Sequence, residues 1–600
     1  MKRPEDTRCK LQPILLDGDR GSLVAFYHPP AEGVAPKGDV MLVPAFAEEM
    51  NRCRSMVTMQ AQALSELGMG SLVLDMRGTG DSPGEFEQAD WDGWRMDLQR
   101  GIAWLRQHGN GCGTLWGVRL GALMAAQLAE RDEAIRQLVF WMPVVTGKTY
   151  WTQFLRIRLA AEMGLANGVK STEELRRRSL HGQVVEASGY QVGPLLAQRL
   201  DTLDMPDGDA LRGRQVAWFE VSPNEEATMP RANAKLADAW RTKDVEVATV
   251  ALAGPQFWQV HERAEAPALI RATTESARGW PSLARSASDL EPSAVLGPTG
   301  DVAATAEYPV AFQCAGCELA GIIHRGKPDA KLGVVIVVAG GPQYRAGAHR
   351  QFVSLGRLFA ADGYPVLRFD LRGMGDSSGQ HLGYEQSRPD IRAAIDEFMR
   401  REPSLEGVAL FGECASASGI LFYAAQDDRV RKIALTNPWV RTSDVQAEAI
   451  LKHYYLDRLK SPEFWQKLRQ GRFNPGASAR SFGATLATYL RGRKNRLATV
   501  ALSGQNDFDH LPLPSRTAEG LRRFHGPVLF LLSGRDLIAR EFDEVTKSSP
   551  AWKGLLADSR ISRKDIADAD HTFSKPEAKA EAQHTLLNWL RGRGTAPAAQ

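Results

Sequence analysis

This sequence of 600 residues contains few cysteines and no long apolar run, and its net charge is small. Six cysteines are too few for a disulfide framework and suit a reducing compartment. Lys and Arg (74) nearly balance Asp and Glu (71), so the net charge of +3 gives no reason to expect nucleic acid or an anionic membrane surface as a partner. The longest apolar run, near residues 334–339, is far shorter than a transmembrane helix. We therefore expect no signal peptide, no integral membrane segment and a cytoplasmic location.

The length exceeds what one hydrophobic core can organise, so at least two domains are expected. The segment LDMRGTGDSPG, which begins at Leu74, recurs as FDLRGMGDSSG, which begins at Phe369. The same spacing relates three further pairs of residues: Gly117 and Gly412, Arg119 and Cys414, and Pro143 and Pro438. Agreement of separate landmarks at one spacing indicates that a whole domain has been duplicated in tandem.

Each half alternates apolar runs of strand length with amphipathic stretches of helix length. This alternation is typical of βαβ units, so we predict the α/β class, with two tandem domains that each contain a mainly parallel, doubly wound sheet. A helical cap is expected in each half, near residues 150–178 and 446–470; the alternative is a pair of surface helices without a role in the site. The predicted domains are residues 1–280 and 307–594. Residues 281–306, rich in small residues and without periodicity, are the predicted linker.

One cysteine lies in a predicted strand–turn–helix segment of the second half. An apolar run at residues 408–411 leads into a tight turn and then a small-residue helical segment. Strand, turn and helix form the nucleophile elbow of α/β hydrolases, which exposes its central residue above the sheet. The elbow residues are Gly412, Glu413, Cys414, Ala415 and Ser416. We predict Cys414 as the nucleophile; the alternatives are a buried core thiol, or Ser416 or Ser418 as the nucleophile.

Two later residues complete a catalytic triad. Asp536 follows a predicted strand at residues 527–532, and His571 lies in a loop ahead of the final predicted helix. The chain order of nucleophile, acid and histidine is that of α/β hydrolases. An imidazole that is bonded to a carboxylate through one nitrogen can accept the thiol proton with the other.

The oxyanion of such a reaction needs two backbone N–H groups. We expect them from Ala415 and Gly341, because Pro342 in the same loop has no N–H. No cofactor and no metal are expected. Cys314 and Cys317 resemble half of a zinc site, but no second pair exists and an expected hairpin turn separates them.

The first half departs from the triad pattern. Arg119 occupies its elbow, and arginine cannot act as a nucleophile. The position expected for the triad acid falls near Asn224 or Glu225. Residues 253–258, where the triad histidine is expected, contain no histidine. We predict a degenerate site at Arg119, Glu225 and Phe46 without turnover by a triad. The guanidinium suits an anionic ligand, or an internal ion pair with Glu48, Glu49 or Glu225; both interpretations stay open.

At these motifs the chain resembles two related families. The first half resembles the type-two hydrolase associated with the exosortase A system, on PAFAEEMN at 44–51, WGVRLGA at 116–122 and GPQFW at 254–258. The second half resembles the type-one hydrolase of that system, on GGPQYR at 340–345, FDLRGMGDS at 369–377, NPWVR at 437–441, LKHYY at 451–455 and DHTF at 570–573. Together these motifs span nearly the whole chain apart from the linker.

The resemblance implies an α/β-hydrolase fold in each half and a natural fusion of two usually separate proteins. It also implies a place among bacterial genes for exopolysaccharide production and PEP-CTERM protein sorting, but supplies no substrate. The elbow arginine belongs to the pattern of the first family, whereas Ala415 stands where the second usually carries an acidic residue.

Two classes of function follow. The first is an esterase, thioesterase or acyltransferase that works through an acyl-Cys414 intermediate, because a thiolate attacks activated carbonyls well. A small molecule or a lipid-linked saccharide is the acyl substrate that the implied gene context suits. The second is a non-catalytic binding or scaffold protein. The sequence specifies no oligomeric state.

Overall fold

The computed structural model describes residues 10–162, 169–284, 306–341, 343–440 and 508–593. Contacts group the chain into two compact units, Met1–Glu406 and Gly407–Gln600. The division falls inside the second half of the duplication, whereas the sequence placed a linker at residues 281–306. Of that linker, residues 285–305 lie outside the described residues.

The first sheet lies within the first unit and has eight strands in the order β1-β2-β4-β3-β5-β6-β9-β10. The strands are β1 (Gln12–Leu16), β2 (Leu23–His28), β3 (Gly38–Val43), β4 (Met69–Leu74), β5 (Cys112–Val118), β6 (Gln137–Trp141), β9 (Gln215–Ser222) and β10 (Glu246–Ala253). β2 pairs antiparallel with β1 and β4, and every other neighbouring pair is parallel. This mainly parallel sheet confirms the predicted fold class.

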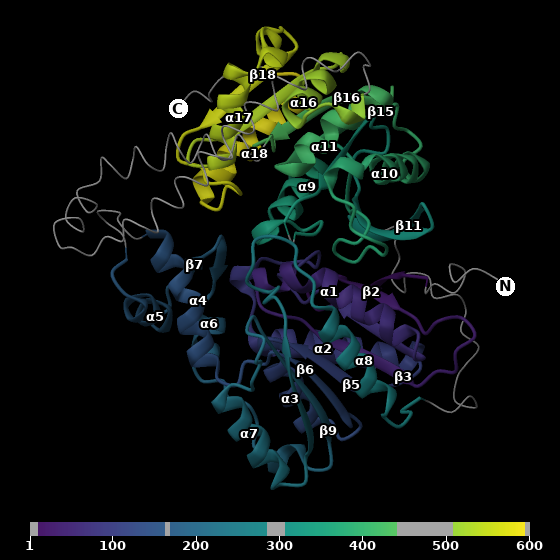
Figure 1. The fold of residues 1–600 in the computed structure, drawn as a ribbon, viewed down its shortest axis with the longest axis vertical. Helices are drawn as coiled ribbons and strands as arrows, with labels where there is room; N and C mark the ends of the chain where they lie inside the picture. Colours follow the sequence, from purple (N-terminus) through teal and green to yellow (C-terminus); the bar gives the residue numbers. More distant parts are fainter. Residues whose placement is uncertain (1–9, 163–168, 285–305, 342, 441–507, 594–600) are drawn as a thin grey trace. The chain divides into compact units, whose positions relative to one another are not determined.

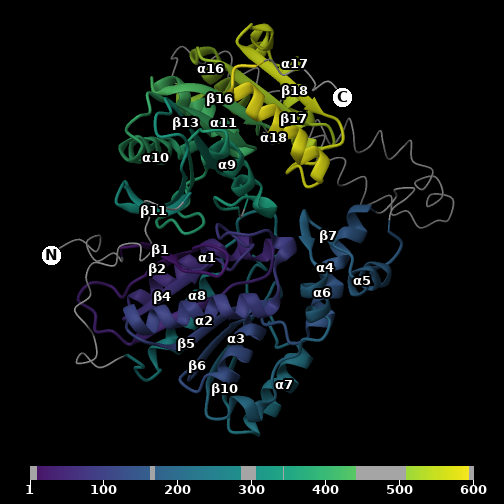
Figure 2. The ribbon, with the colours of Figure 1, turned by 180° about the vertical axis from the view of Figure 1, so that it is seen from behind.

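Helices cover both faces of the first sheet, as can be followed in Figures 1 and 2. They are α1 (Glu48–Ser65), α2 (Trp91–His108), α3 (Leu120–Arg131) and α8 (Pro267–Arg278). Val40 and Leu42 of β3 belong to the core formed with α1 and α8, whereas Met41 and Val43 belong to the core formed with α2 and α3. The apolar runs of the sequence are continuous because such strands are buried on both faces.

A cap is inserted between β6 and β9. It consists of α4 (Gly147–Glu162), α5 (Thr172–Leu180), a hairpin of β7 (Val185–Ala187) and β8 (Tyr190–Val192), and α6 (Pro194–Leu200). α4 and α5 are the helices predicted near residues 150–178. The corresponding cap predicted at residues 446–470 of the second half lies outside the described residues.

The second half repeats this strand order. In the first unit, β11 (Glu307–Cys314), β12 (Cys317–His324), β13 (Leu332–Val338) and β14 (Val366–Asp370) follow the order β11-β12-β14-β13. In the second unit, β15 (Gly407–Glu413), β16 (Val430–Thr436), β17 (Val528–Ser533) and β18 (Ile561–Ile566) follow in chain order. The antiparallel pairs again involve β12, and the other described pairs are parallel.

The helices of the second half also divide between the units. α9 (Gln351–Ala361) and α10 (Arg388–Arg401) belong to the first unit. α11 (Ala415–Tyr423), α16 (Leu513–Arg523), α17 (Leu537–Ser548) and α18 (Pro576–Leu590) belong to the second. The repeated order of elements agrees with the duplication inferred from the sequence.

The repeated glycine-rich segment folds in the same way in both halves. Asp75 follows β4 directly and accepts the backbone N–H of Asp81 (2.9 Å), and Asp370 accepts that of Asp376 (3.0 Å). Gly80 has a φ of +47°, and a Cβ at this position would come within 2.2 Å of the Asp75 carboxyl group. Glycine is required because the loop closes tightly onto its own aspartate.

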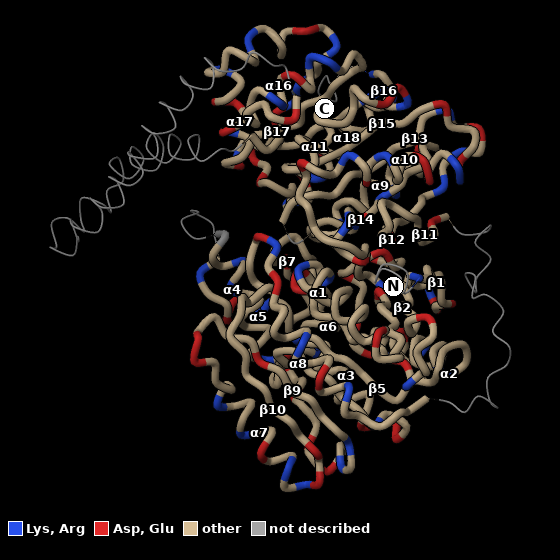
Figure 3. The backbone as a smooth tube through the Cα atoms, turned by 45° about the vertical axis from the view of Figure 1, so that its right-hand side comes forward, with Lys and Arg blue, Asp and Glu red and all other residues tan. Residues whose placement is uncertain are grey.

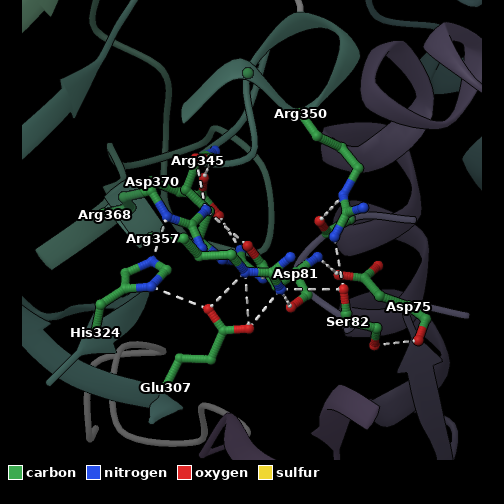
Figure 4. Close-up of polar contacts among 12 residues, drawn as sticks. Asp75, Asp81, Ser82, Glu307, His324, Arg345, Arg350, Arg357, Arg368 and Asp370 are labelled. Atoms are coloured by element: carbon green, nitrogen blue, oxygen red, sulfur yellow. Dashed lines mark hydrogen bonds and ion pairs between the residues drawn. The ribbon is translucent and has the colours of Figure 1, made fainter. Parts of the chain in front are cut away.

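The two copies of this loop meet in a buried aspartate–arginine cluster of the first unit (Figure 4). We define the cluster as Asp75, Asp81, Asp370, Asp376, Arg54, Arg345 and Arg368. Each member is at most 2% exposed. Together they comprise four carboxylates and three guanidinium groups, taken from both halves of the duplication.

Two arginines of the cluster bridge the halves. Arg54 of α1 donates to Asp75 of its own half (2.7 Å) and, through two bonds of 2.7 and 2.9 Å, to Asp376 of the other half. Arg345 pairs with Asp376 (2.7 Å) in its own half and with Asp81 (2.8 Å) of the first. These buried ion pairs join the first half to residues 307–406 within the first unit.

Arg350 and Arg368 extend these contacts. Arg350 donates to the backbone carbonyls of Gly78, Gly80, Ser82 and Gly84, at 2.6–3.1 Å. Arg368 donates to Asp81 (2.7 Å) and to Nε2 of His324 (2.8 Å), whose Nδ1 contacts Glu307 (3.0 Å). Burial lowers the pKa of His324, and the nearby Arg368 charge acts in the same direction. The histidine therefore stays neutral and joins the arginine to the glutamate.

Acidic and basic residues are interspersed along the described chain, as Figure 3 shows. No region of one charge sign emerges that would indicate a polyanionic partner. Within the described ranges, no helix is both long enough and apolar enough to cross a bilayer.

Candidate active site

Cys414 lies between β15 and α11 in a backbone conformation that side-chain-bearing residues rarely adopt, with φ 59° and ψ −121°. Its N–H donates to the carbonyl of Thr436 (2.8 Å), and its own carbonyl accepts the N–H of Trp439 (3.2 Å). A Cβ at Gly412 would come within 2.6 Å of Cδ1 of Ile420 and 2.9 Å of Oγ of Ser416, so both side chains would have to shift to admit a larger residue. This is the strained turn of a nucleophile elbow, and it leaves the thiol partly exposed.

The same turn is found in the first half. Arg119 has φ 55° and ψ −119°. Its N–H donates to the carbonyl of Trp141 (2.9 Å), and its carbonyl accepts the N–H of Val144 (3.1 Å). The elbow is therefore a property of the duplicated fold, whatever side chain it carries.

The predicted triad residues lie together in the second unit. Nδ1 of His571 lies 2.8 Å from Oδ2 of Asp536, and the Cys414 side chain is near enough to contribute to the raised pKa of His571. Asp536 caps the N-terminus of α17, where its carboxylate accepts the N–H groups of Ile538 (3.2 Å) and Ala539 (3.4 Å). The cap fixes the carboxylate, and the positive end of the helix dipole favours its negative charge.

The electrostatics of the site favour a protonated His571. Burial by itself would lower the pKa of His571, but the hydrogen bond to Asp536, the Cys414 side chain and the Glu413 charge outweigh burial and raise this pKa to about 11. The site therefore holds a positive charge on His571 beside a carboxylate.

The serine hydroxyls beside Cys414 are engaged elsewhere. Oγ of Ser416 donates to the carbonyl of Glu413 (2.8 Å) and accepts the N–H of the same residue (2.9 Å). Oγ of Ser418 donates to the carbonyl of Trp439 (2.5 Å). Both serines are at most 1% exposed, so neither presents a hydroxyl to a substrate.

The predicted oxyanion donors belong to different units. Ala415 is the first residue of α11 in the second unit, and Gly341 follows β13 in the first. Pro342 lies outside the described residues. The pairing of these two N–H groups stays a prediction.

Glu49 forms an ion pair with Arg119 in the first half. Nε of Arg119 lies 3.1 Å from Oε1 of Glu49, and the Tyr150 hydroxyl of α4 donates to the other oxygen of this carboxylate (2.8 Å). A second guanidinium nitrogen donates to the carbonyl of Met142 (2.8 Å). Glu225, which the sequence analysis placed in this site, is exposed in the turn after β9 and is not among these contacts.

Aromatic rings surround the Arg119–Glu49 pair. The Trp258 ring lies 5.3 Å from the guanidinium carbon, within the segment where a catalytic histidine was sought. Phe46 packs against Phe86, Trp94, Tyr150 and Phe154, with ring centroids 5.1–6.1 Å apart. Phe46 also lines a small cavity beside Leu120 and Gly121. The internal ion pair proposed as one alternative for Arg119 is therefore formed, in largely apolar surroundings.

Cys314 ends β11 and Cys317 begins β12, so the two residues flank the hairpin turn as register partners. Ala315 and Gly316 form the turn with φ of 49° and 75°. A hairpin turn was expected at this position, and the structure confirms it. Among the described residues, no three His, Cys, Asp or Glu side chains are grouped so as to hold a metal ion.

Comparisons with known proteins assign the same fold to both halves. The family model described as "alpha/beta hydrolase fold" matches residues 333–523, and that described as "Serine aminopeptidase, S33" matches residues 34–192. No curated protein matches the sequence.

Several solved structures are similar to about half of the chain. An esterase of Pyrococcus furiosus is 13% identical and has a TM-score of 0.32, over 48% of this chain and 91% of that one. The esterase domain of a Rhodothermus marinus protein is 16% identical, with a TM-score of 0.29 over 48% and 98%. Est1E of Butyrivibrio proteoclasticus, solved with ferulic acid, is 17% identical, with a TM-score of 0.32 over 44% and 96%. The two family models and the repeated strand order show that the chain carries the α/β-hydrolase fold twice, in tandem.

Proposed function

We propose that the second half cleaves or transfers acyl groups of esters or thioesters through an acyl-Cys414 intermediate. The observation that carries the proposal is the position of His571, whose ring is bonded to Asp536 (2.8 Å) and whose pKa is raised by Asp536 and by the neighbouring Cys414 side chain. This is the relation of base, orienting acid and nucleophile that covalent acyl transfer requires.

Acylation starts from the thiolate and the imidazolium. The sulfur attacks the acyl carbonyl carbon and forms an S–C bond, while the carbonyl electron pair moves onto oxygen. The N–H of Ala415 stabilises this oxyanion, with Gly341 as the second donor that the sequence predicts. When the oxyanion collapses, the bond to the leaving group breaks, and His571 gives its proton to the departing alkoxide or thiolate.

Deacylation reverses these roles. The neutral imidazole accepts a proton from water as the water oxygen attacks the thioester carbon. The C–S bond then breaks, which releases the acid and restores the thiolate and the imidazolium. An acceptor hydroxyl in place of water gives acyl transfer by the same steps, so one site supports hydrolysis and transferase activity alike.

The resemblance to exosortase-associated hydrolases supports a finer proposal. We place the substrate among acylated small molecules or lipid-linked saccharides of exopolysaccharide production. A cytoplasmic location is part of this proposal, because a thiolate nucleophile must stay reduced.

For the first half we propose a hydrolase fold without triad chemistry. The family model matched there is named after a serine peptidase, yet Arg119 occupies the nucleophile position. Its charge is already paired with Glu49 (3.1 Å), which argues against a free anion-binding site.

The reactivity of Cys414 provides the test. Because the pKa of His571 is raised to about 11, we expect the imidazolium to persist from about pH 6.5 to pH 9 and to favour attack by the Cys414 sulfur throughout this range. Iodoacetamide alkylation of Cys414 should then change less than about threefold over this range. For an ordinary thiol, with a pKa of about 8.5, the alkylation rate rises nearly tenfold with each pH unit below that value.

His571→Gln should restore the steep pH dependence, because the glutamine cannot carry the stabilising positive charge. The rate is followed by mass spectrometry of the peptide that contains Cys414, so that other cysteines do not contribute. His584→Gln is the matched control, since His584 is an exposed histidine of α18 in the same unit. A wild-type profile as steep as that of His571→Gln would contradict the catalytic proposal and favour a binding or scaffold protein.

A further inference from the structure

Asn437 directly follows β16 and is fully buried. Its amide nitrogen donates to Oγ of Ser533 (2.9 Å) and to the backbone carbonyl of His571 (3.0 Å). Its amide oxygen accepts the N–H of Ser533 (2.9 Å). One side chain therefore links the ends of β16 and β17 to the loop after β18.

These bonds lie in the segments that carry the proposed triad, and one of them is made to a triad residue, His571. Ser533 ends β17, three residues before Asp536, and His571 is bonded directly through its own carbonyl. Thr436, the residue before Asn437, accepts the N–H of Cys414 (2.8 Å). The amide thus holds the segments of the acid and the base in a fixed relation to the strand that supports the nucleophile.

The duplication provides an internal comparison. Met142 occupies the matching position of the first half, with a φ of 43° against 45° for Asn437. The backbone bonds correspond as well, because Met142 donates to the carbonyl of Phe219 (2.8 Å) and Asn437 to that of Leu531 (3.1 Å). The left-handed turn thus forms without an amide side chain. The amide occurs in the half that contains the triad.

We propose that Asn437 is a positioning residue for His571, an inference that rests on the proposed function of the second half. The bond to the His571 carbonyl fixes the loop, so that the imidazole can contact Asp536 and Cys414 together. Without this bond, the side-chain contact with Asp536 has to hold the ring by itself. Displacements of about 1 Å at a catalytic group cost on the order of 10²-fold in rate.

Two substitutions remove the bond in different ways. Asn437→Gly deletes the amide, and glycine readily adopts the positive φ of 45°. Asn437→Asp keeps the size and the acceptor for the Ser533 N–H but replaces the donor with an oxygen. We expect both variants to lower kcat for p-nitrophenyl butyrate about 10- to 100-fold, with KM changed less than about threefold.

Alkylation of Cys414 separates positioning from a merely structural role. In both variants we expect the pH profile of iodoacetamide alkylation to steepen toward that of His571→Gln. Ser533→Ala is the matched control. It removes an Oγ acceptor of Asn437 but leaves the bond to His571, so its kcat and alkylation profile should stay within about threefold of wild type.

The outcomes are distinguishable. A steep alkylation profile in the wild type would overturn the proposed function itself. A flat wild-type profile, retained in both Asn437 variants together with wild-type kcat, would overturn the positioning role alone. A lowered kcat with a flat profile and a lowered thermal midpoint would also overturn it, because the amide would then serve only stability.

Discussion

Replacing Cys414 with alanine is expected to lower kcat for p-nitrophenyl butyrate by at least about 10³-fold. The methyl group cannot form the S–C bond, so what remains is whatever the oxyanion donors and substrate binding contribute. The substitution removes a partly exposed sulfur at the surface of the elbow. We therefore expect the fold to persist, with a circular dichroism spectrum and thermal midpoint close to those of the wild type.

Ser418→Ala is the matched control for this prediction. Ser418 lies on the same helix, and its buried hydroxyl is bonded to the carbonyl of Trp439 (2.5 Å). Its kcat should stay within about threefold of wild type. Turnover that survives in Cys414→Ala at the wild-type level would assign the chemistry to another centre, and the first half would then have to be reconsidered as a catalyst.

The fold could be predicted from the sequence where its strands are buried on both faces. Residues 408–411 were predicted as a strand and lie inside β15 (Gly407–Glu413), and the strand predicted at residues 527–532 overlaps β17 (Val528–Ser533). Such strands appear as continuous apolar runs. No prediction covered β1 and β2, because this antiparallel pair depends on β4 as its neighbour, which no local pattern reveals.

The part of the candidate site that could be predicted is the set of residues given by the order of nucleophile, acid and histidine along the chain. Cys414, Asp536 and His571 follow β15, β17 and β18 of the second unit, at the edge where such loops gather. The choice of Glu49 over Glu48 and Glu225 as the partner of Arg119 could not be made from the sequence. It depends on the direction in which a side chain of α1 points across the elbow.

The contact between the two aspartate loops could not be predicted from the sequence, for a related reason. The repeated aspartate loops served to align the two halves, and nothing in either copy showed that Arg54 and Arg345 would join one loop to the other. Long-range pairing of buried charges depends on how the halves dock, and the sequence pattern of each half is the same with or without that contact.

Arg345→Met is expected to have the largest effect on stability. Arg345 is fully buried and pairs with Asp81, Asp370 and Asp376. Without it, four buried carboxylates would face two guanidinium groups. Breaking a buried ion pair by removing one partner costs about 3–5 kcal/mol, because the remaining charge stays in an apolar interior. We expect a loss of this size in the free energy of unfolding.

Urea unfolding followed by tryptophan fluorescence measures this loss, since Trp116 and Trp141 are buried in the first half. Arg212→Met is the matched control, because Arg212 and its partner Asp209 are exposed. Its unfolding midpoint should match that of the wild type. An unchanged midpoint in Arg345→Met would mean that the cluster does not hold the halves together.

The pH dependence and a second substitution test the cause. Burial raises the pKa of Asp370 even beside Arg345, and loss of the guanidinium should raise it further. A carboxylate whose folded pKa lies above its unfolded value of about 3.9 costs stability once it ionises. The loss in the free energy of unfolding of Arg345→Met should therefore be larger at pH 8 than at pH 5.

Arg345→Met combined with Asp370→Asn should recover part of this loss, because the amide removes one unpaired charge. If the double variant is no more stable than Arg345→Met alone, the lost stability comes from packing around the arginine rather than from its charge.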